Sequence, residues 1–252
     1  MTHAAARVVL ITGGAVRLGR AMVVEMAQRG WRVVFTYRHS ALAAQQLVAE
    51  LANRGMVAEA LAADLRDAAA RQQLLATIGE RHGRLDALVN NAAVFPRTPR
   101  ETLDLDTWAE VFTTNLAAPV FLTLAAASWL SAARGAVVNL LDIHGRYPVR
   151  SFLPYCVSKA ALEAATRALA VELAPAVRVN GVAPGIALFP LGTPDDVRRR
   201  MLARTLLGRE GGAEEIARAV RYLLEEAETV TGQVLTVDGG RTVHLQEYSA
   251  IE

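Results

Sequence analysis

The stretch Thr12-Gly13-Gly14-Ala15-Val16-Arg17-Leu18-Gly19 decides the fold of this chain. It follows the apolar run Val8–Thr12 and precedes a helical pattern over Leu18–Gln28. Glycines at a strand-to-helix turn let backbone N–H groups approach a pyrophosphate, and the N-terminus of the next helix favours its negative charge. A glycine cluster alone also fits a tight turn. Its position between a strand and a helix favours a nucleotide-binding loop.

Short β-branched runs alternate with helical patterns along the rest of the chain. Further strands are predicted at Arg32–Thr36, Val57–Ala62, Asp86–Asn90, Gly135–Leu141, Val177–Val182 and Val234–Val237. Further helices are predicted at Ala41–Asn53, after a capping Asp67, over Leu105–Ala133 with an interruption near Pro119, and over Phe152–Leu173. Apolar strands alternating with helices indicate a parallel sheet covered on both faces.

The predicted fold class is therefore α/β: a doubly wound parallel sheet of Rossmann type, with about seven strands and helices on both faces. We expect one domain over residues 1–252, because no linker or repeat divides the chain, with residues 241–252 as a C-terminal tail. In such a sheet, ligands bind at the carboxyl ends of the strands.

Composition bounds the classes of function. The 252 residues are 52% hydrophobic and 21% charged, with a formal net charge of +2, which suits a globular chain. Basic residues form no long block, and Arg198-Arg199-Arg200 fits a solvated helix face, so neither nucleic acid nor membrane is an expected partner. Cys156 is the single cysteine, so no internal disulfide and no metal site are expected. Met1–Arg7 does not resemble a signal peptide, and we expect a soluble cytoplasmic protein.

The second strand is followed by Tyr37-Arg38-His39-Ser40, which bears on the choice of nucleotide. A carboxylate here would accept hydrogen bonds from an adenosine ribose and repel a 2′-phosphate. The Arg38 guanidinium instead pairs well with a phosphate, and His39 and Ser40 add donors. We therefore expect NADPH rather than NADH, unless Arg38 is an ordinary exposed arginine.

Tyr155-Cys156-Val157-Ser158-Lys159 places Tyr155 and Lys159 four residues apart, on one face of a predicted helix. A free tyrosine titrates near pH ~10. Because a nearby ammonium stabilises a phenolate, we expect Lys159 to lower the pKa of Tyr155 toward the working range and Tyr155 to act as an acid–base group. Cys156 lies about 100° around the helix from Tyr155 and is predicted to be a small packed residue.

These motifs resemble those of the short-chain dehydrogenase/reductase family, and the resemblance covers nearly the whole chain. Besides the glycine turn and the Tyr155/Lys159 pair, it rests on Asp64-Leu65, Asn90-Asn91-Ala92-Ala93, Thr114-Asn115-Leu116, Val179-Asn180-Gly181, Pro184-Gly185 and Thr236-Val237-Asp238-Gly239-Gly240. The resemblance implies a homotetramer and a catalytic set of Asp142, Tyr155, Lys159 and Asn115, in which Asn115 helps to hold a water relay to the lysine. It implies that the cofactor contacts Gly13, Arg17, Leu18, Gly19, Arg38, His39, Ser40, Asp64, Leu65, Asn91, Ala92, Tyr155, Lys159, Pro184, Gly185 and Ile186.

Three positions depart from the common family pattern, and the mildest is Ala93, which replaces the final glycine of the family's Asn-Asn-Ala-Gly segment. Arg17 stands where the family usually has its middle glycine, and Asp142 stands where a serine usually donates a hydrogen bond to a substrate carbonyl. An ionised carboxylate cannot donate, and it would repel the oxyanion formed when a ketone is reduced. It suits a substrate whose ring nitrogen gains a proton. The alternative is that Asp142 only caps a turn, and that the enzyme is inactive or uses another hydrogen-bond donor.

Arg17, Asp142 and Tyr155 together resemble pteridine reductases and the bacterial dihydromonapterin reductases. Phe95 matches the aromatic residue that stacks on the flat pterin in pteridine reductases, although on its own it also fits a loop hydrophobe. Ile186–Pro190 resembles the substrate-side loop of the same group. The resemblance implies that a pterin contacts Arg17, Phe95, Asp142 and Tyr155.

The expected activity is NADPH-dependent reduction of a C=N bond in a dihydropterin, with oxidised pterins and folates as further candidate substrates. Two alternatives stay open: a carbonyl reductase of 3-oxoacyl or sugar substrates, and a catalytically silent NADPH-binding sensor. Asp142 and Arg17 speak against the first, and an intact Tyr155/Lys159 pair speaks against the second. His144 is near enough in sequence to Asp142 to relay protons but is outside the family pattern.

Overall fold

Seven parallel strands form one sheet in the order β3-β2-β1-β4-β5-β6-β7. The computed structural model describes residues 6–190 and 192–243. The strands are β1 (Val8–Ile11), β2 (Arg32–Tyr37), β3 (Ala58–Ala62), β4 (Ala87–Asn90), β5 (Ala136–Leu140), β6 (Arg178–Pro184) and β7 (Val234–Val237). The order reverses between β1 and β4, so the loops that follow these two strands diverge and open a crevice at the carboxyl ends. The predicted doubly wound α/β fold is confirmed.

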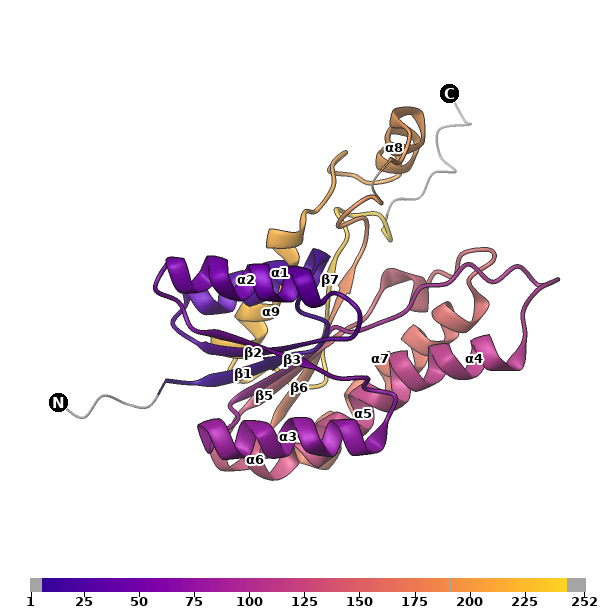
Figure 1. Ribbon diagram of the computed structural model, residues 1–252. Helices are drawn as coiled ribbons and strands as arrows, with labels where there is room; N and C mark the ends of the chain where they lie inside the picture. The colour runs from indigo at the N-terminus through magenta and orange to yellow at the C-terminus, as the bar shows by residue number, and fades with distance from the viewer. Residues whose placement is uncertain (1–5, 191, 244–252) are drawn as a thin grey trace.

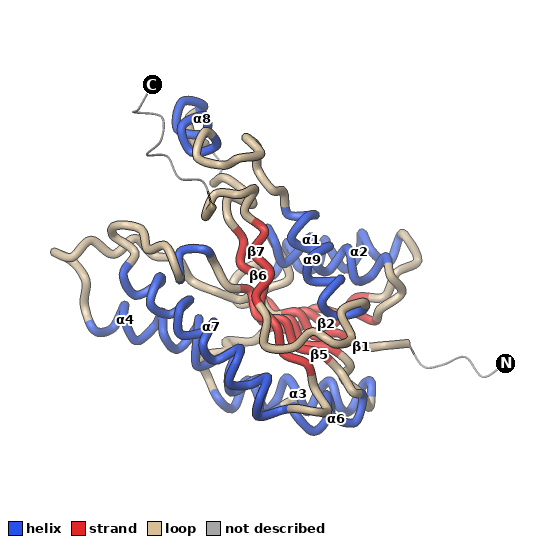
Figure 2. Tube along the Cα trace, turned by 180° about the vertical axis from the view of Figure 1, so that it is seen from behind, coloured by secondary structure: helices blue, strands red, loops and turns tan. Residues whose placement is uncertain are grey.

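Helices cover both faces of the sheet (Figure 1). One face carries α1 (Arg17–Gln28), α2 (Ala41–Asn53) and α9 (Ala213–Glu225). The other carries α3 (Ala68–His82), α5 (Ala118–Ala125), α6 (Ala127–Ala133) and α7 (Leu153–Leu173), with α4 (Leu105–Phe112) beside α7. Seen from behind, α8 (Asp195–Leu202) lies beyond the carboxyl end of the sheet, apart from both layers (Figure 2).

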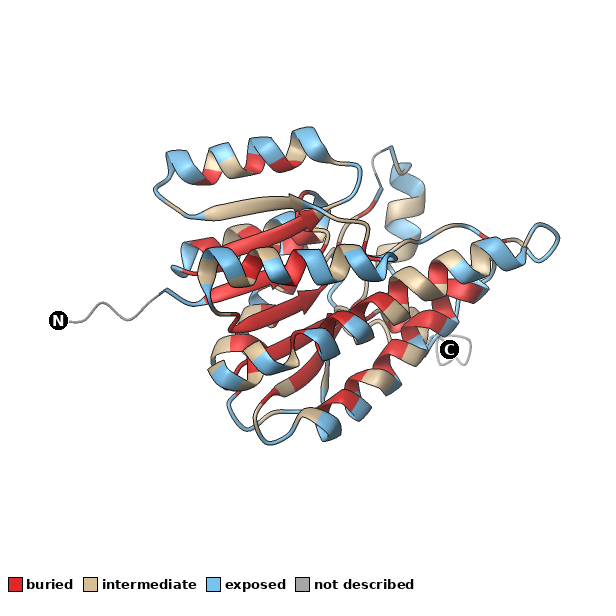
Figure 3. Ribbon diagram, turned by 60° about the horizontal axis from the view of Figure 1, so that its bottom comes forward, coloured by how far each residue is buried: buried red, intermediate tan, exposed pale blue. Residues whose placement is uncertain are grey.

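The central strands are apolar along their whole length because both of their faces are buried. In β1, Val9 and Ile11 pack under α1, whereas Val8 and Leu10 face the opposite layer. Successive side chains of a strand point to opposite faces, so a sheet covered twice needs apolar residues at every position. Buried residues accordingly fill the central strands and the inner faces of the helices, whereas the edge strand β3 is only partly buried (Figure 3).

The predicted helix over Leu105–Ala133 is broken in two places, and neither break is at Pro119 itself. Residues 113–117 form a wider π-helical turn, η1, and Pro119 lies in the first turn of α5, where the ring is tolerated. The sharp bend, of 56°, separates Ala125 from Ala127. In the described part of the chain no single helix is long and apolar enough to cross a membrane; the bent pair 105–125 and 127–133 passes that test together by length and composition.

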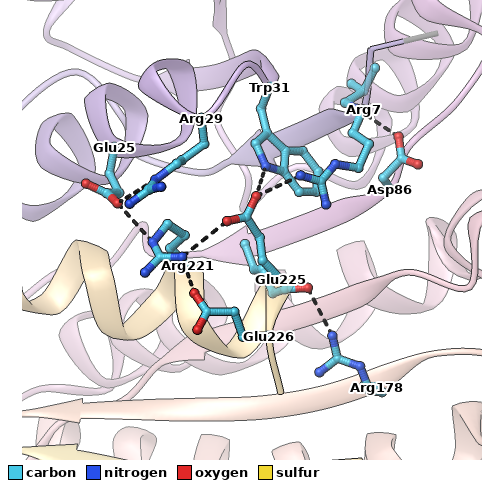
Figure 4. Close-up of polar contacts among 11 residues, drawn as sticks. Arg7, Glu25, Arg29, Trp31, Asp86, Arg178, Arg221, Glu225 and Glu226 are labelled. Atoms are coloured by element: carbon cyan, nitrogen blue, oxygen red, sulfur yellow. Dashed lines mark hydrogen bonds and ion pairs between the residues drawn. The ribbon is translucent and has the colours of Figure 1, made fainter. Parts of the chain in front are cut away.

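A network of polar side chains joins α9 to the amino ends of the central strands (Figure 4). Arg221 of α9 contacts Glu25 of α1 with 3.0 Å between Nε and Oε1. Glu225 accepts hydrogen bonds from Trp31 Nε1 and from the Arg7 guanidinium, both at 2.7 Å. The network is therefore at the opposite end of the sheet from the crevice.

The segment predicted as a C-terminal tail lies mostly outside the described residues, which end at Val243. Its first residue, Arg241, donates a hydrogen bond to the carbonyl oxygen of Met201 in α8 at 3.0 Å. Thr242 N donates to Asp238 Oδ2 at 2.8 Å. The described start of the tail is thus tied to the loop after β7 and to α8.

Candidate active site

The loop after β1 is hydrogen-bonded to the loop after β4, across the point where the strand order reverses. The Thr12 hydroxyl accepts hydrogen bonds from the N–H groups of Asn91 and Ala92 at 2.9 and 3.0 Å. The Asn91 amide donates in return to the carbonyl oxygens of Thr12 and Gly13 at 2.8 and 3.0 Å. Asn91 therefore fixes the glycine turn, a task that the sequence motif alone did not reveal.

The glycine turn needs its glycines for space as well as for conformation. Gly13 has φ +65°, and a Cβ on Gly19 would lie only 2.1 Å from the Gly13 carbonyl oxygen. Arg17 also has a positive φ, of 53°, at the position where the family pattern has glycine. A non-glycine residue in this region costs on the order of 1 kcal/mol or more, and such strain concentrates at functional sites.

A cleft of about 370 Å³ opens above this turn. It brings together eleven residues predicted to bind the cofactor: Gly13, Arg17, Leu18, Gly19, Arg38, His39, Ser40, Asp64, Leu65, Asn91 and Ala92. The other predicted cofactor residues do not line it. Pro184, Gly185 and Ile186 lie at the end of β6, where Gly185 N donates to the Val237 carbonyl oxygen at 3.0 Å.

Charged side chains surround the end of the cleft beyond β2. Arg38 donates from Nε to His39 Nε2 at 2.7 Å, and its guanidinium is 3.9 Å from the Glu110 carboxylate of α4. Arg66 donates to Asp64 through two nitrogens and contacts Glu110 at 3.2 Å. Hydrogen bonds from Arg66 lower the pKa of Asp64 to about 2. Arg66 is a cleft-lining residue that the family motif did not single out.

The Tyr155 hydroxyl donates a hydrogen bond to Asp142 Oδ2 at 2.7 Å. The other carboxylate oxygen of Asp142 accepts from the backbone N–H of His144 at 2.8 Å. Asp142 therefore caps the short helix η2 (Ile143–Gly145) and also contacts the tyrosine, so it is more than a cap.

The expected lowering of the Tyr155 pKa is wrong. Burial raises the pKa of Tyr155 well above its usual value, and the charge of Asp142 and the hydrogen bond to it raise the pKa further. Both effects stabilise the protonated phenol, which is buried and donates to an anion. The Lys159 ammonium lies 5.8 Å from the centre of the tyrosine ring, so it does not offset them.

Lys159 is buried on the same face of α7, with 4% of its surface exposed. Its Nζ donates to the Leu140 carbonyl oxygen at the end of β5, at 2.6 Å. Burial lowers the pKa of Lys159 to about 8, partly opposed by the charge of Asp142. The amine therefore changes charge close to the physiological range.

Asn115 lies in the π-helical turn η1 and is buried. Its amide makes two hydrogen bonds to the backbone of Val94, at 2.9 and 3.0 Å, and donates to Ser158 Oγ at 3.2 Å. Ser158 precedes Lys159 in α7. Asn115 thus links the loop after β4 to the helix that carries the Tyr155/Lys159 pair, and its predicted role in a water relay stays a prediction.

Aromatic side chains border the tyrosine on its open side. Phe95 stacks on Phe152 with 4.3 Å between ring centres and meets the Tyr155 ring edge-on at the same distance. Phe95 remains 52% exposed, so part of its surface is free to meet a ligand. Arg17 reaches toward the segment after β6, 3.5 Å from the Leu188 carbonyl oxygen. Phe152 carries no sequence signal of its own, whereas Leu188 lies in the segment Ile186–Pro190, which the resemblance assigned to the substrate side.

Two residues of uncertain role in the sequence are placed away from the reacting groups. The His144 ring contacts the Tyr147 carbonyl oxygen at 3.0 Å through Nδ1. Cys156 is buried, as predicted, and its sulfur lies 4.0 Å from the Val149 carbonyl oxygen. No group of three or more His, Cys, Asp or Glu side chains suited to a metal ion occurs within residues 6–190 and 192–243.

Residues 14–242 match the family model described as enoyl-(acyl carrier protein) reductase. A 3-oxoacyl-[acyl-carrier-protein] reductase from Synechocystis sp. is 34% identical over 245 residues, covering 95% of this chain and 98% of that protein. Cis-4-hydroxycyclohexanecarboxylate dehydrogenase from Sinomonas cyclohexanicum is 36% identical over 244 residues, covering 94% and 97%.

Among solved structures, the FolM alternative dihydrofolate reductase 1 from Brucella canis, complexed with NADP, superposes with a TM-score of 0.88. It is 33% identical, and the match covers 98% of this chain and 99% of that one. The strand order, the crevice and these full-length matches lead to one conclusion. The chain belongs to the short-chain dehydrogenase/reductase family of NAD(P)-dependent oxidoreductases.

Proposed function

We propose that this protein reduces a C=N bond of a pterin ring with NADPH as hydride donor. The observation that carries the proposal is the 2.7 Å hydrogen bond from the Tyr155 hydroxyl to the Asp142 carboxylate. It joins the acid–base group to an anion at the position where the family usually has a neutral hydrogen-bond donor. The FolM structure, which is named as a dihydrofolate reductase, supports a ring of this kind.

The described residues fit a nicotinamide dinucleotide. The glycine turn leaves no room for side chains, and Val16 at the start of α1 has no polar side chain to occupy the N–H groups there. Such a helix N-terminus favours a pyrophosphate. Arg38, His39 and Ser40 line the end of the cleft beyond β2, where a 2′-phosphate would be recognised. When bound, the reduced nicotinamide supplies the hydride.

The charge of Asp142 decides between the two kinds of double bond. Reduction of a ketone builds negative charge on oxygen, and a neighbouring carboxylate would destabilise it. A ring nitrogen that is gaining a proton becomes more positive, and the same carboxylate stabilises it. The geometry around Asp142 therefore favours C=N reduction over C=O reduction.

The high pKa of Tyr155 keeps its phenol protonated at neutral pH, so the proton is present when the ring binds. We expect the phenol to pass this proton to the ring nitrogen before or as the neighbouring carbon accepts hydride, so that no anionic nitrogen forms beside Asp142. Lys159, whose pKa is about 8, holds a proton or releases it near the same pH, and its amine is fixed by the Leu140 carbonyl. Phe95 offers its exposed surface to a flat ring, and the Arg17 guanidinium reaches the segment after β6, 3.5 Å from the Leu188 carbonyl oxygen.

The test is NADPH oxidation with dihydrobiopterin, dihydromonapterin, dihydrofolate and a panel of ketones. We expect turnover of at least one pterin or folate. Turnover of ketones alone would contradict the proposal. Tight NADPH binding with no turnover of any substrate would favour the catalytically silent NADPH-binding sensor.

Replacement of the aspartate sharpens the test. We expect Asp142→Ser to lower kcat/KM for the pterin by about a hundredfold, because the serine hydroxyl no longer stabilises a positive ring nitrogen. Weak ketone turnover is expected to rise in the same variant, since a donor replaces an anion. Unchanged pterin activity would remove Asp142 from the mechanism.

A second candidate is reduction of a 3-oxoacyl carbonyl, favoured by the Synechocystis relative named for that activity. It requires the Tyr155 hydroxyl to supply the hydrogen bond to the carbonyl oxygen, because an ionised Asp142 carboxylate cannot donate. A 3-oxoacyl thioester in the ketone panel tests it directly.

A further inference from the structure

The loop that carries Asp142 is joined to α7 by an ion pair beyond the reacting groups. We propose that Arg146 and Glu163 form a positioning pair, which holds the Asp142 carboxylate in place against Tyr155. Neither residue lines the cofactor cleft, so we assign them a role through Asp142. The effect on turnover rests on the proposed function, whereas the effect on Asp142 does not.

The pair has the geometry of a strong, directional contact. Arg146 Nε donates to both carboxylate oxygens of Glu163, at 3.0 and 2.8 Å, and a terminal nitrogen donates to Oε1 at 2.6 Å. Glu163 is a buried carboxylate, so losing a partner would leave charge in a poorly solvated place. A bidentate guanidinium fixes orientation as well as distance. Arg146 therefore determines where its own loop lies on α7.

The contact between the loop and α7 is close at the backbone level. A Cβ on Gly145 would lie 2.9 Å from the Ala160 nitrogen and 3.0 Å from the Lys159 carbonyl carbon. Asp142, at the start of the same loop, is held through Oδ1 by the N–H of His144. A shift of η2 away from α7 would therefore carry the Asp142 carboxylate with it.

The same helix supplies both sides of the arrangement. Tyr155, Lys159 and Glu163 are spaced by four residues, so they form one stripe along α7. Tyr155 contacts the first residue of the loop, Asp142, and Glu163 contacts Arg146, just after η2. Two contacts at opposite ends of the loop set its register on the helix.

Glu163 also has a partner that provides a matched control. Arg167, one turn further along α7, donates to Glu163 Oε1 at 2.6 Å but belongs to the helix and not to the loop. Arg146 and Arg167 are both about half exposed at the side chain. Removing either takes one positive charge from Glu163, but only Arg146 fixes the position of Asp142.

Lys159 is a built-in reporter for the position of Asp142. It is the only lysine in the chain, so lysine labelled with 13C and 15N gives one side-chain NMR signal that needs no assignment. The Tyr155 ring lies 5.8 Å from its amine, Glu163 follows one turn along the same helix, and the charge of Asp142 from the loop raises its pKa. Moving the Asp142 carboxylate away therefore lowers the pKa of Lys159.

The sign of the shift separates positioning from direct electrostatics. Removing Arg146 leaves Glu163 less neutralised, and this alone would raise the pKa of Lys159 or leave it unchanged. Displacement of Asp142 would lower it. We expect a downward shift in Arg146→Ala, part of the fall seen in Asp142→Asn, and none in Arg167→Ala.

Turnover gives a second readout on the substrate that the wild-type protein reduces. We expect kcat to fall about tenfold in Arg146→Ala, with the KM for the nucleotide within about twofold, and Arg167→Ala to match the wild type. Arg146→Lys keeps the positive charge but lacks the planar, bidentate guanidinium, and it should recover part of kcat. An upward or absent shift of the Lys159 signal in Arg146→Ala overturns the proposal, whether or not kcat falls. If no substrate is found, the Lys159 titration still decides it.

Discussion

The two ends of the site differ in how far their charged and titratable groups are exposed to solvent. At the nucleotide end, Arg38, Arg66 and Glu110 form ion pairs that remain open to solvent. At the chemical end, Tyr155 and Lys159 are buried, and their pKa values are displaced. Exposed ion pairs contribute about 0–1 kcal/mol and are screened by salt, whereas buried charges interact strongly. The difference shows that the contacts at the nucleotide end are individually weak and screened by salt, whereas the chemistry depends on a few buried groups that interact strongly.

The largest expected effect is a loss of turnover from a substitution at the chemical end alone. In Tyr155→Phe the proton donor is lost, and we expect kcat to fall about a thousandfold. The dissociation constant of NADPH, measured by fluorescence titration, should change far less, because the glycine turn and the residues after β2 are untouched. Equal losses in kcat and in NADPH affinity would show that the two ends are not separable.

The next effect concerns stability and pH at the buried lysine. In the unfolded chain Lys159 has its usual pKa of 10.5, and in the folded protein its pKa is about 8. Between these values the unfolded state binds the additional proton, so the free energy of unfolding rises with pH. This increase in the free energy of unfolding begins at about pH 8, continues toward pH 10 and amounts to about 3 kcal/mol at most. Tyr155, whose pKa is raised, opposes it only above its unfolded value of about 10.

Urea unfolding of the wild type and of Lys159→Met between pH 7 and 10 measures this contribution. The rise in the free energy of unfolding with pH should be present in the wild type and absent in the variant. Methionine removes the ionisable amine while keeping an unbranched chain in the buried space. Parallel curves for the two proteins would contradict the lowered pKa.

The same contrast explains what the sequence could predict. The nucleotide end is encoded by local order: an apolar strand, a glycine turn and a helix, followed by Arg38 after the second strand. Its residues do gather in one cleft. The strands were predictable for a similar reason, since a sheet covered on both faces leaves uninterrupted apolar runs.

The chemical end was harder because its properties arise from packing between distant segments. The sequence places Lys159 four residues from Tyr155, which predicts a lowered tyrosine pKa. The pKa is instead raised by burial and by Asp142, and neither burial nor that distance can be read from spacing. Phe152 and the Arg146–Glu163 pair were missed for the same reason. The homotetramer stays a prediction of the resemblance, and the cytoplasmic location stays a prediction from the composition and the N-terminal sequence.

The smallest expected effect returns to the nucleotide end and tests its choice of cofactor. In Arg38→Asp a charge-assisted contact to the 2′-phosphate is replaced by repulsion, beside a Glu110 that is already negative. We expect NADPH to bind about thirtyfold more weakly, equal to about 2 kcal/mol, and NADH to be almost unaffected. Arg100→Asp makes the same charge change at an almost fully exposed loop residue and should alter neither affinity. Equal weakening of both nucleotides would mean that Arg38 supports the cleft instead of reading the phosphate. A difference between them that shrinks as salt is raised would identify the screened contact that the exposed geometry implies.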